Sequence, residues 1–295
     1  MPANLVTLRV WGDFACFTRP EMKVERVSYP LITPSAARGV LEAVFWEPQM
    51  LFWIDSIRVV RRGQWISIRR NEVTKVISLG DASTWMSAPE KTKTIAAGGG
   101  AGDGTQRNML ALSGVEYLIT AEIRLSSLAQ PPRDNLGKYT DEFRRRAKSG
   151  KCHHRPGLGM REFAADFEWE DDPQAALVRR RAEHSAAGEE TFPWSEDLGL
   201  MLYDVFAPAS RATGFQWLNA DESIAATAAF EQTLTGIAKG EAIKHRKTYA
   251  ANPLRHTRGQ LAAPQPSFFR AAIRDSLMDC HPERIRILTT NSQGA

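Results

Sequence analysis

The chain has 295 residues, of which 43% are hydrophobic and 24% are charged, a composition that supports a sizeable folded core and argues against disorder. Its formal net charge is only +4, so the placement of basic residues says more about partners than the total does. Three widely spaced cysteines argue against a disulfide framework and a four-cysteine zinc site, and they suit a reducing cytoplasm. We find no signal-peptide pattern and no apolar run of the roughly 18 residues that cross a bilayer, so no membrane association is predicted.

The N-terminal part of the chain is predicted to contain strands and one helix. The helix is expected over residues 33–46, with Thr33 as its N-cap and Pro34 at the first helical position, where a missing N–H does no harm. Apolar residues recur along it at helical spacing, so one face should pack on a sheet. Strands are expected at 4–12, 53–60 and 64–70, the last two joined as a hairpin around Arg62 and Gly63.

The middle of the chain holds a glycine-rich stretch, a clear strand and a basic segment. Residues 96–106 are too rich in glycine to pack and are predicted to form a mobile loop. Residues 115–125 alternate as expected for a half-buried antiparallel strand. The basic segment 138–150 is predicted to be a short helix that stops at Gly150. Further strands are expected at 158–169 and 198–207.

The character of the sequence changes after about residue 219. Residues 222–240 favour a helix, whereas residues 241–266 are basic, punctuated by prolines and poor in core residues. Late strands are expected at 267–275 and 284–289.

The order of these elements predicts an α+β fold. A ferredoxin-like domain is expected over residues 1–151, including the glycine-rich loop, and a second, mainly β segment over residues 152–295. We see no internal repeat.

Several common catalytic motifs are missing from the sequence. It contains no nucleotide phosphate loop, no dinucleotide-binding glycine motif, no zinc-protease motif and no serine-hydrolase elbow. Cys152, His153 and His154 are three residues of metal-binding type in a row, but adjacent residues rarely converge on one ion. We therefore predict neither a metal site nor a cofactor.

The stretch GKYTDEFRRRAKSGKCHHRP, residues 137–156, is dense in basic side chains. Lys138 and Tyr139 come where a loop should meet a helix N-terminus, a natural seat for a phosphate. Arginine runs also occur on solvated helix faces, so the alternative to a phosphate-binding site is a solvent-exposed helix without a ligand. Basic patches elsewhere favour a groove for a phosphate backbone. The candidate nucleic-acid-binding residues are Arg69, Arg70, Arg144, Arg145, Arg146, Lys148, Lys151 and Arg155.

The same stretch offers groups for acid–base chemistry. Tyr139, His153 and His154 are candidates for proton transfer, and Lys138 is the candidate cation. RNA carries its own nucleophile in the 2′-OH. A protein therefore needs only to orient that group, take its proton, stabilise the phosphorane and protonate the leaving 5′-oxygen. Such a reaction requires no metal.

Long blocks of the sequence resemble one protein family. The segment WGDFACFTRPEMKVERVSYPLITPSAARGVLEAVFWEP is similar to the N-terminus of the Cas-five proteins of CRISPR type I-C systems, in their d-type variant. IRRNEV, the basic stretch, GMREFAADF and LGLMLYDVF follow in the expected order. The resemblance covers most of residues 5–206 and returns at PSFFRAAIRD. The segment from about 207 to 266 has no counterpart and is expected to be a basic insertion.

The resemblance implies a RAMP-type fold, with an N-terminal ferredoxin-like domain and a C-terminal, mainly β segment. It implies a metal-independent endoribonuclease that cuts repeat hairpins in precursor CRISPR RNA. The protein would then keep the 5′ handle as a subunit of the type I-C Cascade complex, which serves antiviral defence. The implied partners are this RNA, the backbone and large subunits of Cascade and, as a further candidate, duplex DNA.

The catalytic residues that the resemblance implies are only partly present. The family's described site uses a tyrosine from the first helix and a lysine–histidine pair before the basic helix. These positions fall on Phe45, Lys138 and Tyr139, so only the lysine is kept. Tyr139 can act as a base at pH 7 only if Lys138 or an arginine lowers its pKa. Two other functions stay open: a subunit that binds the 5′ handle without cutting, and a basic scaffold whose insertion docks a partner.

Overall fold

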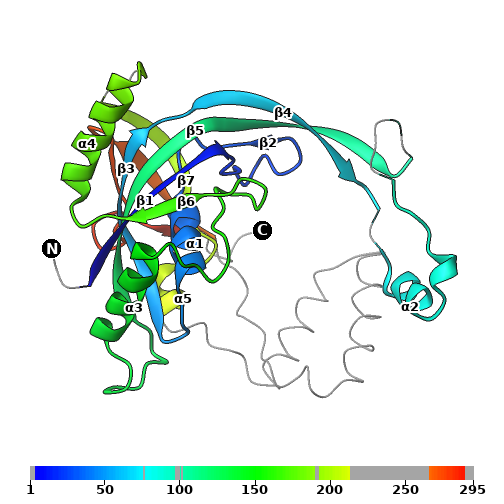
Figure 1. Cartoon of the computed structure of the whole chain (residues 1–295), viewed down its shortest axis with the longest axis horizontal. Helices are drawn as coiled ribbons and strands as arrows, with labels where there is room; N and C mark the ends of the chain where they lie inside the picture. Colours follow the sequence, from blue (N-terminus) through cyan, green and yellow to red (C-terminus); the bar gives the residue numbers. More distant parts are fainter. Residues whose placement is uncertain are drawn as a thin grey trace.

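The computed structural model describes residues 4–75, 77–96, 100, 102–189, 193–212 and 266–289 of the chain. Two sheets and a set of helices form this part of the molecule (Figure 1). The strands are β1 (Leu5–Ala15), β2 (Arg26–Val27), β3 (Met50–Arg61), β4 (Gln64–Val73), β5 (Gly104–Leu125), β6 (Asp166–Trp169), β7 (Glu196–Asp204), β8 (Ser267–Ile273), β9 (Leu277–Asp279) and β10 (Leu288–Thr289). The helices are α1 (Pro34–Val44), α2 (Leu79–Ser87), α3 (Leu136–Lys148), α4 (Pro173–Ala186) and α5 (Pro208–Ala212), with a 3₁₀ turn at Pro89–Lys91.

The larger sheet has the strand arrangement of a ferredoxin-like domain. Its path runs β6-β1-β5-β3-β9, and all of these neighbours pair in antiparallel fashion. Along the chain the relevant elements follow one another as β1-α1-β3-β5-α3-β6, the split βαβ arrangement. The predicted α+β class with a ferredoxin-like domain is confirmed.

Helices cover both faces of this sheet. Leu8 of β1, Tyr117 of β5 and Phe143 of α3 belong to the main core, which α1 also completes. Leu118 of β5 points to the opposite face, because successive side chains of a strand alternate, and it packs there with Leu177 of α4. The basic helix α3 and the helix α4 therefore lie on different sides of the sheet.

The helix α1 begins where the sequence predicts. The Thr33 hydroxyl accepts a hydrogen bond from the backbone N–H of Ala36 at 3.2 Å, and Pro34 occupies the first turn. The predicted cap and first residue are therefore confirmed. The helix ends at Val44, two residues before the expected boundary, and Phe45 already has an extended backbone.

A strand of 22 residues, β5, replaces the short strand that the sequence predicts. Its C-terminal half pairs with β3 and its N-terminal half with β4, so β3 and β4 lie end to end along β5. The hairpin expected around Arg62 and Gly63 is therefore wrong. Gly63 has a φ of +78°, and a Cβ there would lie 2.7 Å from Val115 Cγ1. The glycine lets the chain kink between the two strands without reversing direction.

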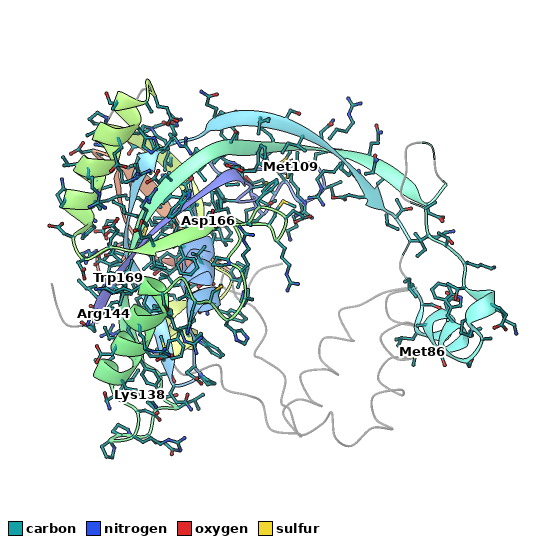
Figure 2. All side chains as sticks on the ribbon, viewed as in Figure 1. Met86, Met109, Lys138, Arg144, Asp166 and Trp169 are labelled. Carbon is teal, nitrogen blue, oxygen red and sulfur yellow. The ribbon has the colours of Figure 1, made fainter. Side chains whose placement is uncertain are left out.

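The paired halves of β4 and β5 project from the body as an arm, residues 64–73 and 104–113 (Figure 1). The arm leads to α2, a helix with no buried residue, on which Met86 is 85% exposed (Figure 2). The glycine-rich loop expected over 96–106 lies partly outside the described residues. Its last residues, 104–106, belong to β5 and not to a loop.

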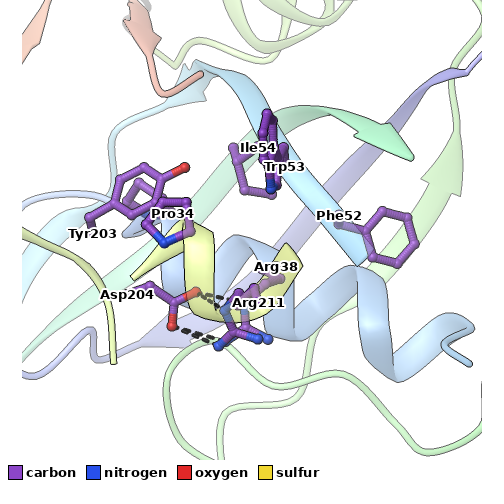
Figure 3. Close-up of a pocket in the computed structure, with 9 residues that line it drawn as sticks. Pro34, Arg38, Phe52, Trp53, Ile54, Tyr203, Asp204 and Arg211 are labelled. Carbon is purple, nitrogen blue, oxygen red and sulfur yellow. Dashed lines mark hydrogen bonds and ion pairs between the residues drawn. The ribbon is translucent and has the colours of Figure 1, made fainter. Parts of the chain in front are cut away.

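A second sheet, β10-β8-β7, is anchored to α1 by a buried ion pair network (Figure 3). Asp204, at the end of β7, accepts hydrogen bonds from Arg38 of α1 at 2.9 Å and from Arg211 of α5 at 2.6 Å. Burial alone would raise the pKa of Asp204, but the two guanidinium groups outweigh it and lower that pKa. The ionised carboxylate therefore fixes the second sheet against the first helix.

Other elements differ from the sequence-based expectations. The strand expected over 158–169 is mostly wrong, because β6 covers only its last four residues and turns precede it. The late strand expected over 284–289 shrinks to the two residues of β10. The helix α4 was not predicted from the sequence. Asp172 is its N-cap and Pro173 its first residue, and both are usual signals of a helix start.

Two expectations concern regions or boundaries that the structure leaves open. The helix expected over 222–240 and most of the basic insertion near 207–266 lie outside the described residues. The division after residue 151 stays a prediction, since β6 and β9 of the second segment extend the sheet of the first. Within the described ranges, no helix combines the length and apolar character needed to cross a membrane.

Candidate active site

The helix α3 carries most of the basic residues that the sequence singles out. It starts after Asn135, whose side-chain oxygen accepts a hydrogen bond from the backbone N–H of Lys138 at 2.9 Å. Tyr139, Phe143 and Ala147, four residues apart, form its buried face. The charged side chains are therefore divided between two exposed flanks, one beside the end of α1 and the other beside β6.

The first flank borders a cleft of about 510 Å³, which we call the α3 cleft. It brings together Phe45, Lys138 and Tyr139, the three positions at which the resemblance places the family's site. Its other lining residues are Glu47, Gln49, Arg133, Asp134, Asp141, Glu142, Arg145 and Arg146.

Lys138, Asp134 and Tyr139 form a hydrogen-bonded chain in the α3 cleft. The Tyr139 hydroxyl donates to Asp134 Oδ1 at 2.7 Å, and Lys138 Nζ donates to the same oxygen at 3.5 Å. Tyr139 is 1% exposed, whereas the Lys138 side chain is 50% exposed. Burial, with the hydrogen bond to Asp134 and its charge, raises the pKa of Tyr139 to about 12. At pH 7 Tyr139 is therefore a neutral hydrogen-bond donor, and Lys138 is the cation that a ligand can reach.

Arg145 and Arg146 form the outer side of the α3 cleft. Both donate hydrogen bonds of 2.7 Å to Glu142, and these bonds lower the pKa of Glu142 to about 2. The Arg146 guanidinium also lies 5.1 Å from the centroid of the Phe45 ring. Exposed ion pairs of this kind contribute little stability, so a phosphate can replace the Glu142 carboxylate as the partner of either arginine.

Arg144 and Lys148 lie on the other flank, beside the edge strand β6, where Figure 2 labels Arg144 and Trp169. Their charged groups are 5.3 and 5.9 Å from the centroid of the Trp169 ring. Each also has an exposed acidic partner, Asp141 at 3.3 Å and Asp171 at 3.5 Å. An aromatic ring with flanking cations is an arrangement that holds single-stranded nucleic acids.

His153 and His154 lie at the C-terminal end of α1 and do not line the α3 cleft. Their backbone N–H groups both donate to the carbonyl oxygen of Ala43, at 2.8 and 3.2 Å. Both side chains are exposed, with ring centroids 5.9 Å apart. The structure therefore holds the backbone of the histidine pair at the end of α1, two residues before Phe45, which lines the α3 cleft.

The remaining predicted binding residues lie away from the flanks of α3. Lys151 is exposed just after the helix, and Arg155 has an acidic partner on β6 at 3.3 Å. Arg69 is exposed on the arm. Its neighbour Arg70 points to the opposite face of the arm and pairs with Glu162 at 3.1 Å. The predicted set thus surrounds the body and the base of the arm and does not form one patch.

Three residues around α3 were not predicted from the sequence. Arg133 and Asp134 line the α3 cleft from the loop before the helix, and Trp169 supplies the ring on the other flank. No spacing in the sequence marks them, because their roles depend on how the loop and the edge strand fold back on α3. Within the ranges that the structure describes, no three His, Cys, Asp or Glu side chains gather as metal ligands would.

The fold and the α3 cleft define a class of protein. It consists of ferredoxin-like α+β proteins with cationic side chains around the end of α1 and on both flanks of α3. The model of the Cas5d family, described as CRISPR-associated protein (Cas_Cas5), matches residues 5–239, and the chain belongs to this family. The resemblance stated from the sequence is thereby confirmed.

Known relatives give the extent of the similarity. A protein of Mannheimia succiniciproducens named CRISPR pre-crRNA endoribonuclease Cas5d is 40% identical over 205 residues, which are 69% of this chain and 85% of the relative. A protein of Thermus thermophilus with the same name is 42% identical over 200 residues, 67% of this chain and 72% of the relative. The solved structure of the functionally uncharacterized protein SMU1763c from Streptococcus mutans matches with a TM-score of 0.50 at 14% identity, covering 97% of each chain. That last likeness concerns the fold alone.

Proposed function

We propose that this chain is a metal-independent endoribonuclease that cuts repeat hairpins in precursor CRISPR RNA. Membership of the Cas5d family and two relatives named pre-crRNA endoribonucleases support the activity. The α3 cleft is the observation that supports a location for it, because Lys138 is exposed there beside Arg145 and Arg146. After cleavage the protein keeps the 5′ handle as a subunit of the type I-C Cascade complex.

The proposed reaction uses the 2′-OH of the RNA as nucleophile. Its oxygen bonds to the adjacent phosphorus, its proton passes to a base, and the bond between phosphorus and the 5′-oxygen breaks. The 5′-oxygen takes a proton, so the products are a 2′,3′-cyclic phosphate and a 5′-hydroxyl. Lys138 stabilises the negative charge of the phosphorane. His153 or His154 supplies the base, because both imidazoles are exposed at the end of α1, and an imidazole that takes the 2′-OH proton can give a proton to the leaving 5′-oxygen.

In this reaction Tyr139 can act as a proton donor but not as the base. Its pKa of about 12 keeps the phenol protonated at pH 7. The proton is given to Asp134 in a hydrogen bond, so it reaches the RNA only when that bond opens. In the structure, Tyr139 donates a hydrogen bond to Asp134, and Asp134 in turn orients Lys138.

Single-turnover cleavage of a repeat hairpin in EDTA tests the proposal. The wild type should cut at one position and leave a cyclic phosphate, which mass spectrometry of the fragments identifies. Lys138→Ala should lower the rate by about 100-fold, because it removes a charge-stabilising group. Arg286→Ala removes an exposed charge at the far end of the described chain and should leave the rate unchanged.

Each variant locates a different part of the chemistry. Loss of cutting in His154→Ala, but not in His153→Ala, would identify His154 as the base. Tyr139→Phe keeps the ring and removes only the hydroxyl, so a normal rate in this variant would exclude it from proton transfer. Full activity of Lys138→Ala would place the active site elsewhere.

A non-cleaving subunit that holds the 5′ handle is the second candidate function. Phe45 has no hydroxyl, Tyr139 is buried, and no histidine lines the α3 cleft. These observations favour a site that binds phosphates without proton transfer. Tight binding of the repeat hairpin by the wild type, with no cleavage over hours, would support this function over the first.

The proposed contacts and partners follow from the cationic surface. Arg69, Arg70, Arg144, Arg145, Arg146, Lys148, Lys151 and Arg155 are proposed to bind the RNA backbone. The backbone and large subunits of Cascade are proposed as protein partners, duplex DNA as a further ligand, and the cytoplasm as the location.

A further inference from the structure

A second cleft lies along α1, between this helix and residues 154–161. We call it the α1 cleft. Its volume is about 700 Å³, within the range of roughly 300–1,000 Å³ that is typical of ligand sites. Phe17 and Thr18, which follow β1, complete its lining. Of its residues, only His154 and Arg155 have a role in the function proposed above.

The lining of the α1 cleft is cationic. Among the described residues it contains Arg155, Arg161 and His154, and no carboxylate. Arg161 is exposed and has no acidic partner among the described residues, while Arg155 has only an exposed ion pair with Asp166. The α3 cleft, by contrast, is lined by four acidic and four basic side chains. The α1 cleft therefore presents a less compensated positive charge, which suits a phosphate.

The helix face that forms the floor of the α1 cleft has small side chains. Ser35, Gly39 and Ala43 lie on it, four residues apart. Glycine is the least favourable residue in a helix interior after proline, yet a Cβ at Gly39 would meet no atom within 4 Å. Gly159, on the opposite wall, is different, because a Cβ there would lie 2.1 Å from the carbonyl oxygen of Cys16. The fold requires Gly159, whereas packing against the described residues does not account for Gly39.

One side of the α1 cleft is apolar. Met160 and Phe17 line it, and both are buried. A thioether beside an open space makes favourable contacts with a flat ring. The cleft thus offers cations and an apolar surface together, which matches the two halves of a nucleotide, its phosphate and its base.

Both clefts extend to the C-terminal end of α1. Ala43 lines the α1 cleft, and Phe45, two residues later, lines the α3 cleft. The carbonyl oxygen of Ala43 holds the backbone of His153 and His154 at this point. A nucleic-acid strand that entered both clefts would therefore pass the two imidazoles.

We propose that the α1 cleft is a subsite for single-stranded RNA, and that it holds one unpaired nucleotide that flanks the repeat hairpin. The phosphate of this nucleotide contacts Arg155 and Arg161, and its base lies against Met160. This inference rests on the proposed function, because it takes the RNA substrate as given. It also places the phosphate between the two clefts beside His154.

Size substitutions at Gly39 test the subsite. Gly39→Leu fills the open space and should lower the affinity for a hairpin with an unpaired flank by about tenfold, the effect expected from one lost base contact. The affinity for a blunt hairpin should not change. Gly39→Ala is the matched control, which adds a single methyl group and should fold at least as stably as the wild type. Fluorescence anisotropy with the two RNAs gives the affinities, and thermal unfolding checks the fold.

A second variant keeps the test decisive if Gly39→Leu does not fold. Arg161→Gln removes a charge that has no partner among the described residues, and it should produce the same selective loss for the flanked hairpin. A photoreactive 4-thiouridine in the flank should crosslink to the peptide that contains Met160.

The possible failures are distinguishable. If the wild type cuts and binds the flanked hairpin, and both variants do so with unchanged affinity, the inference is overturned and the proposed function stands. If the wild type neither binds nor cuts the hairpin, the proposed function fails and the inference fails with it. A third result is that a free nucleoside monophosphate raises the unfolding temperature of the wild type but not of Gly39→Leu, while both proteins bind the RNA with equal affinity. The cleft would then bind a nucleotide without being part of an RNA path, which also overturns the inference.

Discussion

Glu116 of β5 is a buried carboxylate, 1% exposed, beneath the helix α4. It accepts hydrogen bonds from Arg9 at 2.7 Å and Arg180 at 2.8 Å, and His184 Nε2 lies 2.7 Å away. Burial alone would raise the pKa of Glu116, but the hydrogen bonds from Arg180, Arg9 and His184 outweigh it and lower the pKa to about 2. The ionised carboxylate thus connects α4 to the sheet.

Removing this charge should destabilise the protein. We expect Glu116→Gln to lower the free energy of unfolding at pH 7 by about 3 kcal/mol, because it removes the buried charge that Arg9, Arg180 and His184 share. Glu168→Gln is the matched control: Glu168 also pairs with Arg9, at 3.0 Å, but its side chain is 59% exposed, so the loss should be less than about 1 kcal/mol. Urea denaturation measures both values, and equal losses would contradict the prediction.

The contribution of Glu116 to stability should also depend on pH. The pKa of Glu116 falls from its ordinary value of 4.5 to about 2 on folding, so its contribution is complete above about pH 4.5 and is lost as the pH falls toward 2. The wild type should therefore lose stability over this range more steeply than Glu116→Gln. Acid unfolding curves of the two proteins that ran parallel would show that another group is responsible.

Single residues also show what a sequence can and cannot give. Lys138 and Tyr139 are adjacent and were predicted as one catalytic pair, but a helix turns about 100° per residue, so only one of them faces the solvent. The spacing of Tyr139, Phe143 and Ala147 would have indicated that the tyrosine is buried. The hydrogen bond from Tyr139 to Asp134 could not be predicted, because it depends on the path of the preceding loop.

At the scale of elements, the kink between β3 and β4 is a point of high sensitivity. We expect Gly63→Ala to lower the free energy of unfolding by about 2 kcal/mol, because a φ of +78° is strained for alanine and its Cβ would press on Val115. Gly102→Ala, where a Cβ meets nothing within 4 Å, is the control and should be nearly neutral. Thermal unfolding compares the two, and a neutral Gly63→Ala would show that the kink relaxes freely.

Elements were predictable where the signals are local. The cap at Thr33, the proline that follows it and the apolar spacing all lie within α1, and that helix was found. Gly63 indicates that one strand ends and another begins, but no local signal shows which strand β4 pairs with. β4 pairs with residues of β5 that lie 31 to 49 positions later in the chain, from Val73↔Gly104 to Gln64↔Ser113, so the predicted hairpin is wrong.

At the scale of the molecule, RNA affinity should depend on salt through particular side chains. For single strands, the slope of log affinity against log salt is about −0.7 for each phosphate that is neutralised. Replacing Arg144 and Lys148 together by Gln should therefore reduce the slope by about 1.4. Arg286→Gln should leave it unchanged. Filter binding over a salt series measures the slopes, and an unchanged slope in the double variant would remove the β6 flank of α3 from the RNA path.

The whole fold was predictable from the order of elements and from the family resemblance, but the clefts were not. The α1 cleft joins Phe17, Gly39 and Arg161, which lie far apart in the chain and share no motif. The net charge of +4 gave no hint of it either, because acidic residues elsewhere mask local excesses of positive charge. A concave surface is a property of tertiary packing, which is why it first appears in the structure.

The long strand β5 makes the reach of the arm adjustable in discrete steps. Every residue of β4 from Gln64 to Val73 pairs with β5. β3 pairs with β5 only beyond Gly114, and β1 and β2 pair with no residue of β5 before Met109, so the outer part of the arm can change length without altering the sheet of the body. Two extra residues in each arm strand would move α2 outward by about 7 Å and leave all side chains on their faces. A single extra residue in each would exchange the faces of Arg69 and Arg70. Evolution can therefore tune distance by even insertions and orientation by odd ones.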